Sequence, residues 1–175
     1  MLKNCLVLKL QDFGENSLIV TLLHSQLGKV ECLAKGGKNI GAKLTPFLQP
    51  SSLVNLWLAP AKGSLPTIRE VEAARSYLPL GDYFGLKFSL HVLALLEKVT
   101  HPSLECRDLM RSTLEILKVV LRPRLPIADL KKLWIQFELC VLSHLGIKPD
   151  TKTIRAHNLD ALAHILEKRI HQNYG

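Results

Sequence analysis

The sequence predicts an α+β protein of two domains, a small β-barrel followed by an all-α domain. Two observations predict this class. Up to residue 78, short apolar runs rich in β-branched residues alternate with turns that carry Gly, Pro, Asn or Asp, as in small barrels. From residue 79 onward, the apolar residues recur at the spacing of helices. The predicted domains are therefore residues 1–78 and residues 79–175.

Five strands are expected in the first domain, at residues 2–10, 17–24, 29–34, 51–58 and 65–77. Residues 12–16 supply turn chemistry between the first two strands, because Gly relieves the backbone and Asp and Asn bond to it locally. Gly36 and Gly37 make the loop after the third strand flexible.

About four helices are expected in the second domain, at residues 83–99, 103–121, 127–145 and 158–171. Pro102 ends the first helix, because Pro cannot continue the hydrogen-bond ladder, and residues 122–126 break the pattern again. Gly146 is expected to cap the third helix at its C-terminus, and Asn158 the fourth at its N-terminus.

The chain is basic, with a formal net charge of +8 and a sequence pI of about 9.5. Residues 1–80 carry nine Lys and Arg against five Asp and Glu, and residues 81–175 carry fourteen against ten, so each part has a net charge of +4. Such an excess favours a polyanionic partner such as nucleic acid. No apolar run reaches 18 residues and no secretion signal is visible, so a cytoplasmic protein without membrane contact is expected.

The sequence carries no signature of an enzyme. Gly37 and Lys38 lack the upstream Gly and the downstream Ser or Thr of a phosphate-binding loop, and no nucleophile elbow or zinc-protease motif occurs. The four cysteines form no close pair, which predicts small buried side chains rather than zinc ligands. His157, His164 and His171 recur every seven residues, which separates neighbours by roughly 10 Å on a helix, too far to share one ion. Neither a metal nor another cofactor is expected.

The candidate binding residues of the first domain surround its Gly-rich loop. Glycines let the backbone approach a phosphate, and lysines attract it over a longer range. Phe13, Phe47 and Trp57 are candidate stacking platforms for unpaired bases, although Phe47 is expected in the core and Trp57 equally in the core or exposed. The lysines have a solvated loop as their alternative. The candidates are Lys29, Lys35, Gly36, Gly37, Lys38 and Lys43, with Arg69 a weaker one.

Several segments, in order and spacing, resemble the RecO family of bacterial recombination mediators. They are the turn at residues 12–15, Leu-Gly-Lys-Val at 27–30, Ala-Lys-Gly at 34–36, Leu-Gln-Pro at 48–50 and the stretch 137–150. The resemblance implies an oligonucleotide-binding (OB) fold that binds single- and double-stranded DNA and anneals strands without catalysis. It also implies RecR and single-stranded-DNA-binding protein as partners, indirect action on RecA, and a place at the bacterial nucleoid.

The chain departs from that family in two respects. Many members carry a four-cysteine zinc motif where residues 151–156 contain none, and the usual member is longer, so a short member without zinc is expected. The acidic, apolar tail of the single-stranded-DNA-binding protein would need a basic apolar groove, for which Arg122, Arg124, Lys131 and Lys132 are candidates. A solvated helix face is their alternative. Two other functions stay open, namely a protein–protein adaptor with a vestigial barrel and an RNA-binding barrel.

Overall fold

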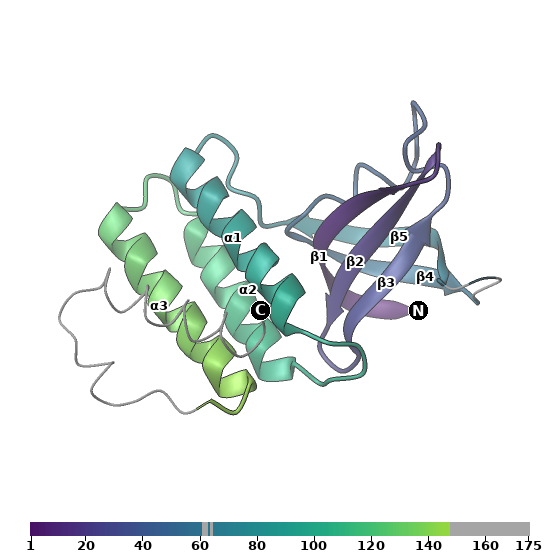
Figure 1. Ribbon diagram of the computed structural model, residues 1–175. Coiled ribbons are helices and arrows are strands. Elements are labelled where there is room, and N and C mark those ends of the chain that lie inside the picture. The colour runs from purple at the N-terminus through teal and green to yellow at the C-terminus, as the bar shows by residue number, and fades with distance from the viewer. Residues whose placement is uncertain (61–62, 64, 148–175) are drawn as a thin grey trace. The chain divides into compact units, whose positions relative to one another are not determined.

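The computed structural model describes residues 1–60, 63 and 65–147, and it confirms the predicted α+β class (Figure 1). The predicted fourth helix at residues 158–171 lies outside the described residues. The elements are β1 Leu2–Phe13, β2 Ser17–His24, β3 Gly28–Ala34, β4 Ser52–Ala59, β5 Thr67–Ser76, α1 Tyr83–Val99, α2 Arg107–Val120 and α3 Ile127–His144.

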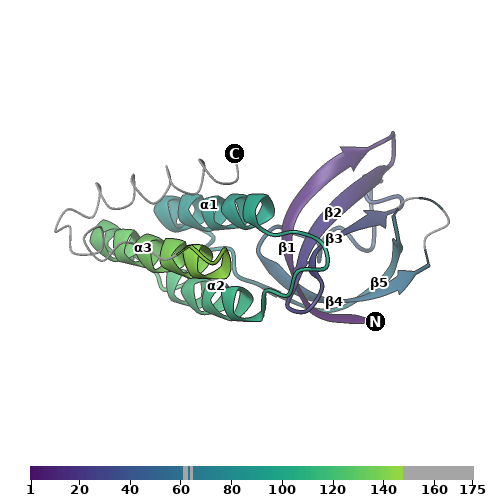
Figure 2. The same cartoon turned by 60° about the horizontal axis from the view of Figure 1, so that its bottom comes forward.

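The five strands form a closed barrel in the order β1-β2-β3-β5-β4. All neighbouring pairs are antiparallel except β3 and β5, which run parallel and pair only at Leu33 and Thr67. A hydrogen bond of 2.8 Å from the Leu33 amide to the Pro66 carbonyl lies beside this pair. Because β4 also pairs with β1, the sheet has no free edge, as in OB-folds. Figure 2 shows β1, β2 and β3 side by side on one wall of the barrel.

The barrel interior is filled by alternate residues of each strand. Val20 pairs with Cys32 and Leu18 pairs with Ala34, and all four side chains are buried. Because successive side chains of a strand point to opposite faces, the residues between them face outward. The interior cluster consists of Cys5, Val7, Leu18, Val20, Leu22, Cys32, Ala34, Leu48, Val54, Leu56 and Ile68.

The first strand is longer than the pattern predicts. Asp12 pairs with Leu18 and Phe13 pairs with Ser17, so the turn shrinks to the three residues between them and β2. A register shift between Val7 and Lys9 bends β1, as bulges do, and its two ends pair with β2 and β4.

The chain divides into two compact units, and each unit is made of two segments that are separated in the sequence. The first unit combines Met1–Leu78 with Leu93–Arg107, and the second combines Pro79–Val92 with the described residues 108–147. Helix α1 therefore contributes its second half to the barrel unit and its first half to the helical unit.

Within the first unit, the β2–β3 turn is hydrogen-bonded to the loop after α1. The Ser103 amide donates to the Leu27 carbonyl at 2.8 Å, and the Cys106 amide donates to the Ser25 carbonyl at 2.9 Å. These bonds hold residues 103–106 outside a helix. They explain why α2 begins at Arg107 and not at residue 103 as predicted.

The helical unit has well-defined helix ends. The Asp82 carboxylate accepts hydrogen bonds from the amides of Phe84 and Gly85, at 3.1 and 3.2 Å, and so caps α1. Gly146, with φ of 70°, follows α3, and the Ile147 amide donates to the Leu142 carbonyl at 2.9 Å, which is the predicted glycine cap.

Trp134 of α3 joins this helix to the first half of α1. Its ring centroid lies 5.9 Å from that of Phe88 and 6.2 Å from that of His91, in edge-to-face arrangements. The ring of Phe137, which is fully buried, lies 5.8 Å from Trp134 on the same helix. The Trp-bearing stripe of α3 is thus largely a packing surface.

Candidate nucleic-acid interface

The outer face of β1, β2 and β3 carries a row of side chains at the end of the barrel where β1 turns into β2. Phe13 pairs with Ser17, and Lys35 follows Ala34, the last residue of β3, which pairs with Leu18 beside Ser17. Arg69 of β5 lies two residues beyond Thr67, and Thr67 pairs with Leu33, two residues before Lys35. We call Phe13, Ser17, Lys35 and Arg69 the outer row; among them only Ser17 is not exposed.

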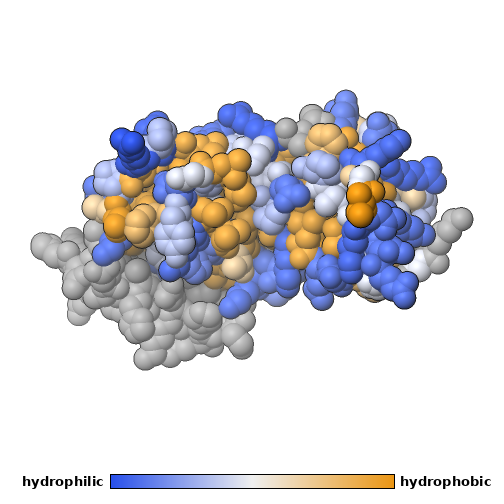
Figure 3. All heavy atoms as spheres, turned by 90° about the horizontal axis from the view of Figure 1, so that it is seen from above, coloured by the Kyte–Doolittle hydropathy of each residue, from blue (hydrophilic) through white to orange (hydrophobic). Residues whose placement is uncertain are grey.

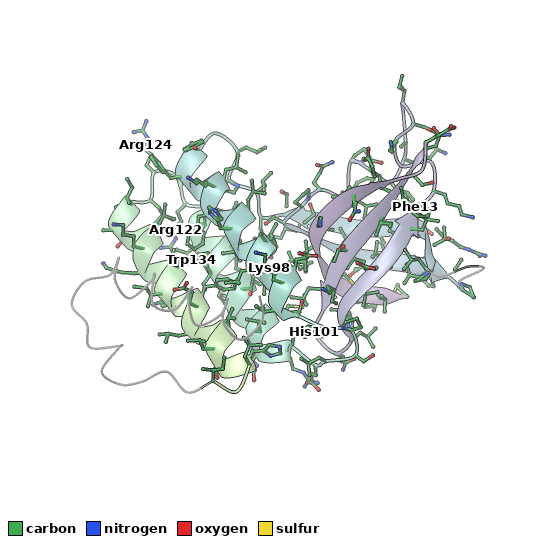
Figure 4. The ribbon with its side chains drawn as sticks, in the orientation of Figure 1. Phe13, Lys98, His101, Arg122, Arg124 and Trp134 are labelled. Atoms are coloured by element: carbon green, nitrogen blue, oxygen red, sulfur yellow. The ribbon has the colours of Figure 1, made fainter. Side chains whose placement is uncertain are left out.

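The outer row combines an aromatic ring with two cationic groups and contains no carboxylate. Phe13 is 49% exposed, unusual for a side chain of its size at the end of a strand. Figure 4 shows Phe13 on the barrel. Lys9 and Gln11 precede Phe13 at alternate, outward-facing positions of β1, so this edge continues as a polar and basic strip. Lys9 was not among the residues predicted from the sequence, although its spacing from Phe13 is the signal that could have found it.

The Gly-rich loop lies over the mouth of the barrel rather than on the outer row. Gly37 packs so closely that an added Cβ atom would lie 3.1 Å from both the Leu18 side chain and the Ala34 carbonyl oxygen. The hydroxyl of Thr45 donates to the Gly37 carbonyl and fixes the loop from the other side. Gly36 adopts φ of 68°, which favours glycine.

Lys38 is held by the β1–β2 turn. Its amide donates to the Asn16 carbonyl at 3.1 Å, and its ammonium donates to Asp12 Oδ2 at 3.1 Å and to the Gly14 carbonyl at 3.2 Å. Lys43, farther along the loop, is exposed. Lys35 and Lys43 therefore present their charges to solvent, whereas a carboxylate compensates the charge of Lys38.

Lys29 does not join this group. It lies at the opposite end of β3 from Lys35, six residues away, which corresponds to roughly 20 Å along a strand. Its ammonium donates to the Glu97 carbonyl at 2.9 Å, in the last turn of α1. The sequence placed all the candidate lysines around the Gly-rich loop. In the barrel, Lys29 lies apart from the others.

The three candidate aromatic side chains are all exposed, but their surroundings differ. Phe47 is 46% exposed, so its predicted core position is wrong. The turn that contains it buries Leu48 fully and packs Leu44 against the interior. Trp57 is also 46% exposed, on the outer face of β4, where it pairs with Glu70 of β5. A carboxylate at that position disfavours a phosphate backbone beside Trp57.

Three of the four cysteines, Cys5, Cys32 and Cys106, are buried as the sequence predicts, whereas Cys140 is half-buried. Burial raises the pKa of Cys5 to about 12, with a smaller contribution from Cys32. Burial likewise raises the pKa of Cys32 to about 12 and that of Cys106 to about 11. These three thiols stay protonated at neutral pH, and the thiolate is the nucleophile and the metal ligand.

A second candidate surface lies on the helical unit. Arg122 and Arg124 are exposed in the α2–α3 connection, and Arg124 points away from the helices (Figure 4). Lys132 forms an ion pair of 3.0 Å with Asp129, and Lys131 is exposed on α3. Large apolar side chains are exposed just before α1, in its first turn and at the start of α3, namely Leu80, Tyr83, Phe84 and Ile127. Figure 3 shows apolar atoms gathered over the helical unit, at the left of the view.

Residues 1–77 match the family model described as Recombination protein O N terminal. Residue 77 directly follows the last residue of β5, so the match covers the whole barrel. The barrel is a RecO N-terminal domain. The resemblance noted in the sequence and the predicted OB-type barrel are thereby confirmed.

Several curated relatives extend the similarity beyond the RecO barrel. The DNA repair protein RecO of Vibrio cholerae is 28% identical over 150 residues, which cover 85% of this chain and 59% of the relative. The protein of the same name from Exiguobacterium sibiricum is 29% identical over 150 residues, covering 82% of this chain and 56% of the relative. The chain thus spans somewhat less than three fifths of the length of these RecO relatives.

Two parts of the chain bear on metal binding. Among residues 1–60, 63 and 65–147, no group of three or more His, Cys, Asp or Glu is arranged to hold a metal ion. The cysteine-free segment 151–156, and His157, His164 and His171, lie outside the described residues. Within the part that is described, no helix is both long and apolar enough to span a bilayer.

Proposed function

We propose that this chain binds DNA through the outer row of its barrel and acts in DNA repair and recombination. The observation that carries the proposal is the combination of Phe13, Lys35 and Arg69 on one face of an OB-type barrel of the RecO family. In OB-folds the strand 2–3 face and the adjoining loops take up oligonucleotides. Aromatic rings stack on bases there, and cations neutralise the phosphates.

Single strands fit this surface better than duplex does. An aromatic ring stacks only on a base whose face is unpaired, and Phe13 stands at the edge of the row, where a strand can pass over it. The cations contribute without sequence preference, so duplex binding through phosphates alone would be weaker and more sensitive to salt.

Annealing and the loading of RecA are the finer parts of the proposal, and neither needs a chemical step. A cationic surface lowers the repulsion between two phosphate backbones, which lets complementary bases pair. Binding to chromosomal DNA would place the protein in the cytoplasm, at the nucleoid.

We further propose that the helical unit receives the protein partners, RecR and the acidic tail of single-stranded-DNA-binding protein. Arg122 and Arg124 supply positive charge, and the exposed side chains of Tyr83, Phe84 and Ile127 supply apolar area. An acidic segment with apolar residues complements that combination. Lys131 and Lys132 are secondary candidates, because Lys132 is already paired with Asp129.

The deciding experiment is fluorescence anisotropy with a labelled single-stranded oligonucleotide over a range of salt concentrations. Three exposed cations, Lys35, Lys43 and Arg69, should give a log–log slope near −2, from roughly −0.7 for each phosphate neutralised. Lys35→Ala should make the slope shallower by about 0.7. Lys29→Ala is the matched control and should leave it unchanged. Binding that is absent at low ionic strength would refute the proposal, and a matched RNA oligonucleotide that binds better would favour the RNA alternative.

A further inference from the structure

The ion pair between Lys38 and Asp12 joins the Gly-rich loop to the end of β1. The two residues are 26 positions apart in the sequence, and the ammonium lies 3.1 Å from the carboxylate oxygen. Asp12 follows Gln11 and precedes Phe13 on β1, so it faces the mouth of the barrel while Phe13 faces the outer row. The pair therefore stands directly beside the proposed DNA-binding face.

The bonding of the Lys38 ammonium leaves room for one further ligand. An ammonium group has three donors, and the Asp12 carboxylate and the Gly14 carbonyl accept two of them. The Lys38 side chain is 29% exposed and that of Asp12 is 77% exposed, so solvent and solutes reach the pair. A phosphate oxygen accepts a hydrogen bond from an ammonium group as a carboxylate oxygen does, so phosphate and Asp12 have Lys38 as a common donor.

We propose that Asp12 competes with nucleic-acid phosphate for Lys38 and thereby limits the affinity of the site. The inference rests on the proposed DNA binding at the outer row, and it makes Asp12 a residue that sets affinity without contacting the strand productively. A lysine whose charge is already neutralised releases no counterion when a phosphate arrives, so Lys38 adds little to the salt-dependent part of binding. Removing the negative charge of Asp12 would let Lys38 contribute to the salt-dependent part of DNA binding.

The Lys38–Asp12 ion pair is weak enough for a phosphate to displace Asp12. Exposed ion pairs are weak, because both partners remain well hydrated and are screened by salt. A strand held by Lys35 and by stacking on Phe13 would present its phosphates near Lys38 at high effective concentration. Asp12 can then be displaced, but each displacement gives up an existing contact, and the net gain in affinity is reduced accordingly.

Asp12→Asn is the informative variant, because the amide oxygen can still accept a hydrogen bond from Lys38 and preserve the loop. Glu15→Gln is its matched control, since Glu15 lies in the turn that directly follows β1, is exposed, and among the described residues forms no ion pair. Both variants remove one negative charge from the same end of the barrel. They differ in whether that charge is paired with Lys38.

The experiment measures single-stranded oligonucleotide affinity against salt for wild type, Asp12→Asn, Glu15→Gln and each of these combined with Lys38→Met. Asp12→Asn should raise affinity about two- to fivefold at low salt, the range expected for an exposed ion pair, and steepen the log–log slope by about 0.7. Glu15→Gln should leave the slope unchanged. In the Lys38→Met background, the two substitutions should have equal effects.

Two results separate the failure of this inference from the failure of the proposed function. Equal effects of Asp12→Asn and Glu15→Gln on wild-type binding would overturn the competition and leave DNA binding intact. Absence of salt-dependent binding in the wild type itself would overturn both. Thermal melting of each variant checks that the fold is retained, and a variant that has lost its fold is replaced by Asp12→Ser.

Discussion

The amide of Lys29 donates a hydrogen bond of 3.1 Å to the carbonyl of His101, so β3 begins where the loop after α1 passes the barrel. At this point Gly28 and Pro102 also form an isolated antiparallel β-bridge. Gly28, with φ of 66°, lies at this point, and an added Cβ atom would lie 2.2 Å from the His101 carbonyl oxygen. The Leu-Gly-Lys-Val segment that resembles RecO thus has a packing reason for its glycine.

Gly28→Ala should destabilise the protein strongly. The substitution combines a strained left-handed backbone with a clash against two carbonyl oxygens, so we expect the free energy of unfolding to fall by about 2–4 kcal/mol. Gly14→Ala is the matched control, because Gly14 also has a positive φ of 59° but no atom within 4 Å of the added Cβ. It should cost about 1 kcal/mol. Chemical denaturation measures both, and equal losses would contradict the clash.

His24 should make stability depend on pH. Burial lowers its pKa below the ordinary value of 6.5, and its Nδ1 accepts hydrogen bonds from the amides of Gln26 and Leu27, at 3.3 and 3.2 Å. The unfolded chain therefore binds the proton more tightly than the folded chain. The stabilisation is complete above pH 6.5 and is lost as the pH falls below this value toward the lower folded pKa.

His24→Asn should flatten this dependence, because the Asn side-chain oxygen can accept the same amide bonds without titrating. The measurement is the free energy of unfolding between pH 7 and pH 5, and the informative quantity is its change relative to wild type. His101→Asn, at an exposed position of the neighbouring loop, should keep the wild-type pH dependence. A wild-type slope in His24→Asn would assign the acid sensitivity to other groups.

The backbone conformation of Arg124 lowers the stability of the fold, while its side chain supplies an exposed positive charge. It adopts φ of 58°, a region that costs a side chain with a Cβ atom energy and that glycine tolerates. Arg124→Gly should raise the free energy of unfolding by about 0.5–1 kcal/mol and weaken binding of an acidic, apolar peptide. Arg122→Gly removes the same side chain where φ is not positive, so it should weaken the peptide without stabilising the fold. If Arg124→Gly stabilises the fold but leaves peptide binding unchanged, Arg124 does not belong to the partner site.

The sequence predicts those elements whose determinants are local. Helix α1 has the predicted bounds because its apolar spacing, its capping Asp82 and its terminal Pro102 all lie within or beside it. The start of α2 could not be predicted in this way, since Ser103 and Cys106 are held by bonds to a turn almost 80 residues earlier.

The candidate site shows the same division between local and distant information. The sequence identifies Lys35 and Phe13 by residue type. Only strand pairing shows that Arg69 follows the point where β5 meets β3 near Lys35, whereas Lys29 lies at the other end of β3. The ion pair of Lys38 with Asp12 likewise joins residues whose own surroundings give no sign of it. Residue type selects the candidates, and strand pairing decides which of them lie near one another.

Phe13 and Trp57 offer a direct test of which face of the barrel binds a strand. The two rings are exposed to nearly the same extent, but Phe13 lies in a row with Lys35 whereas Trp57 pairs with Glu70. Stacking is worth about 1–3 kcal/mol per base, so Phe13→Ala should weaken single-stranded DNA binding by that amount, while Trp57→Ala should have little effect. Because a ring carries no charge, Phe13→Ala should also leave the salt slope unchanged.

An abasic oligonucleotide with the same number of phosphates provides the control for this comparison. It keeps the electrostatic contacts and removes the base faces, so wild type and Phe13→Ala should bind it equally well. A loss on Trp57→Ala with none on Phe13→Ala would move the strand to the β4–β5 face, despite the carboxylate of Glu70 there. Such an outcome would require the positive charge of Arg69 and Arg75 to outweigh Glu70 and Glu72, because these four side chains are the charged groups of β5.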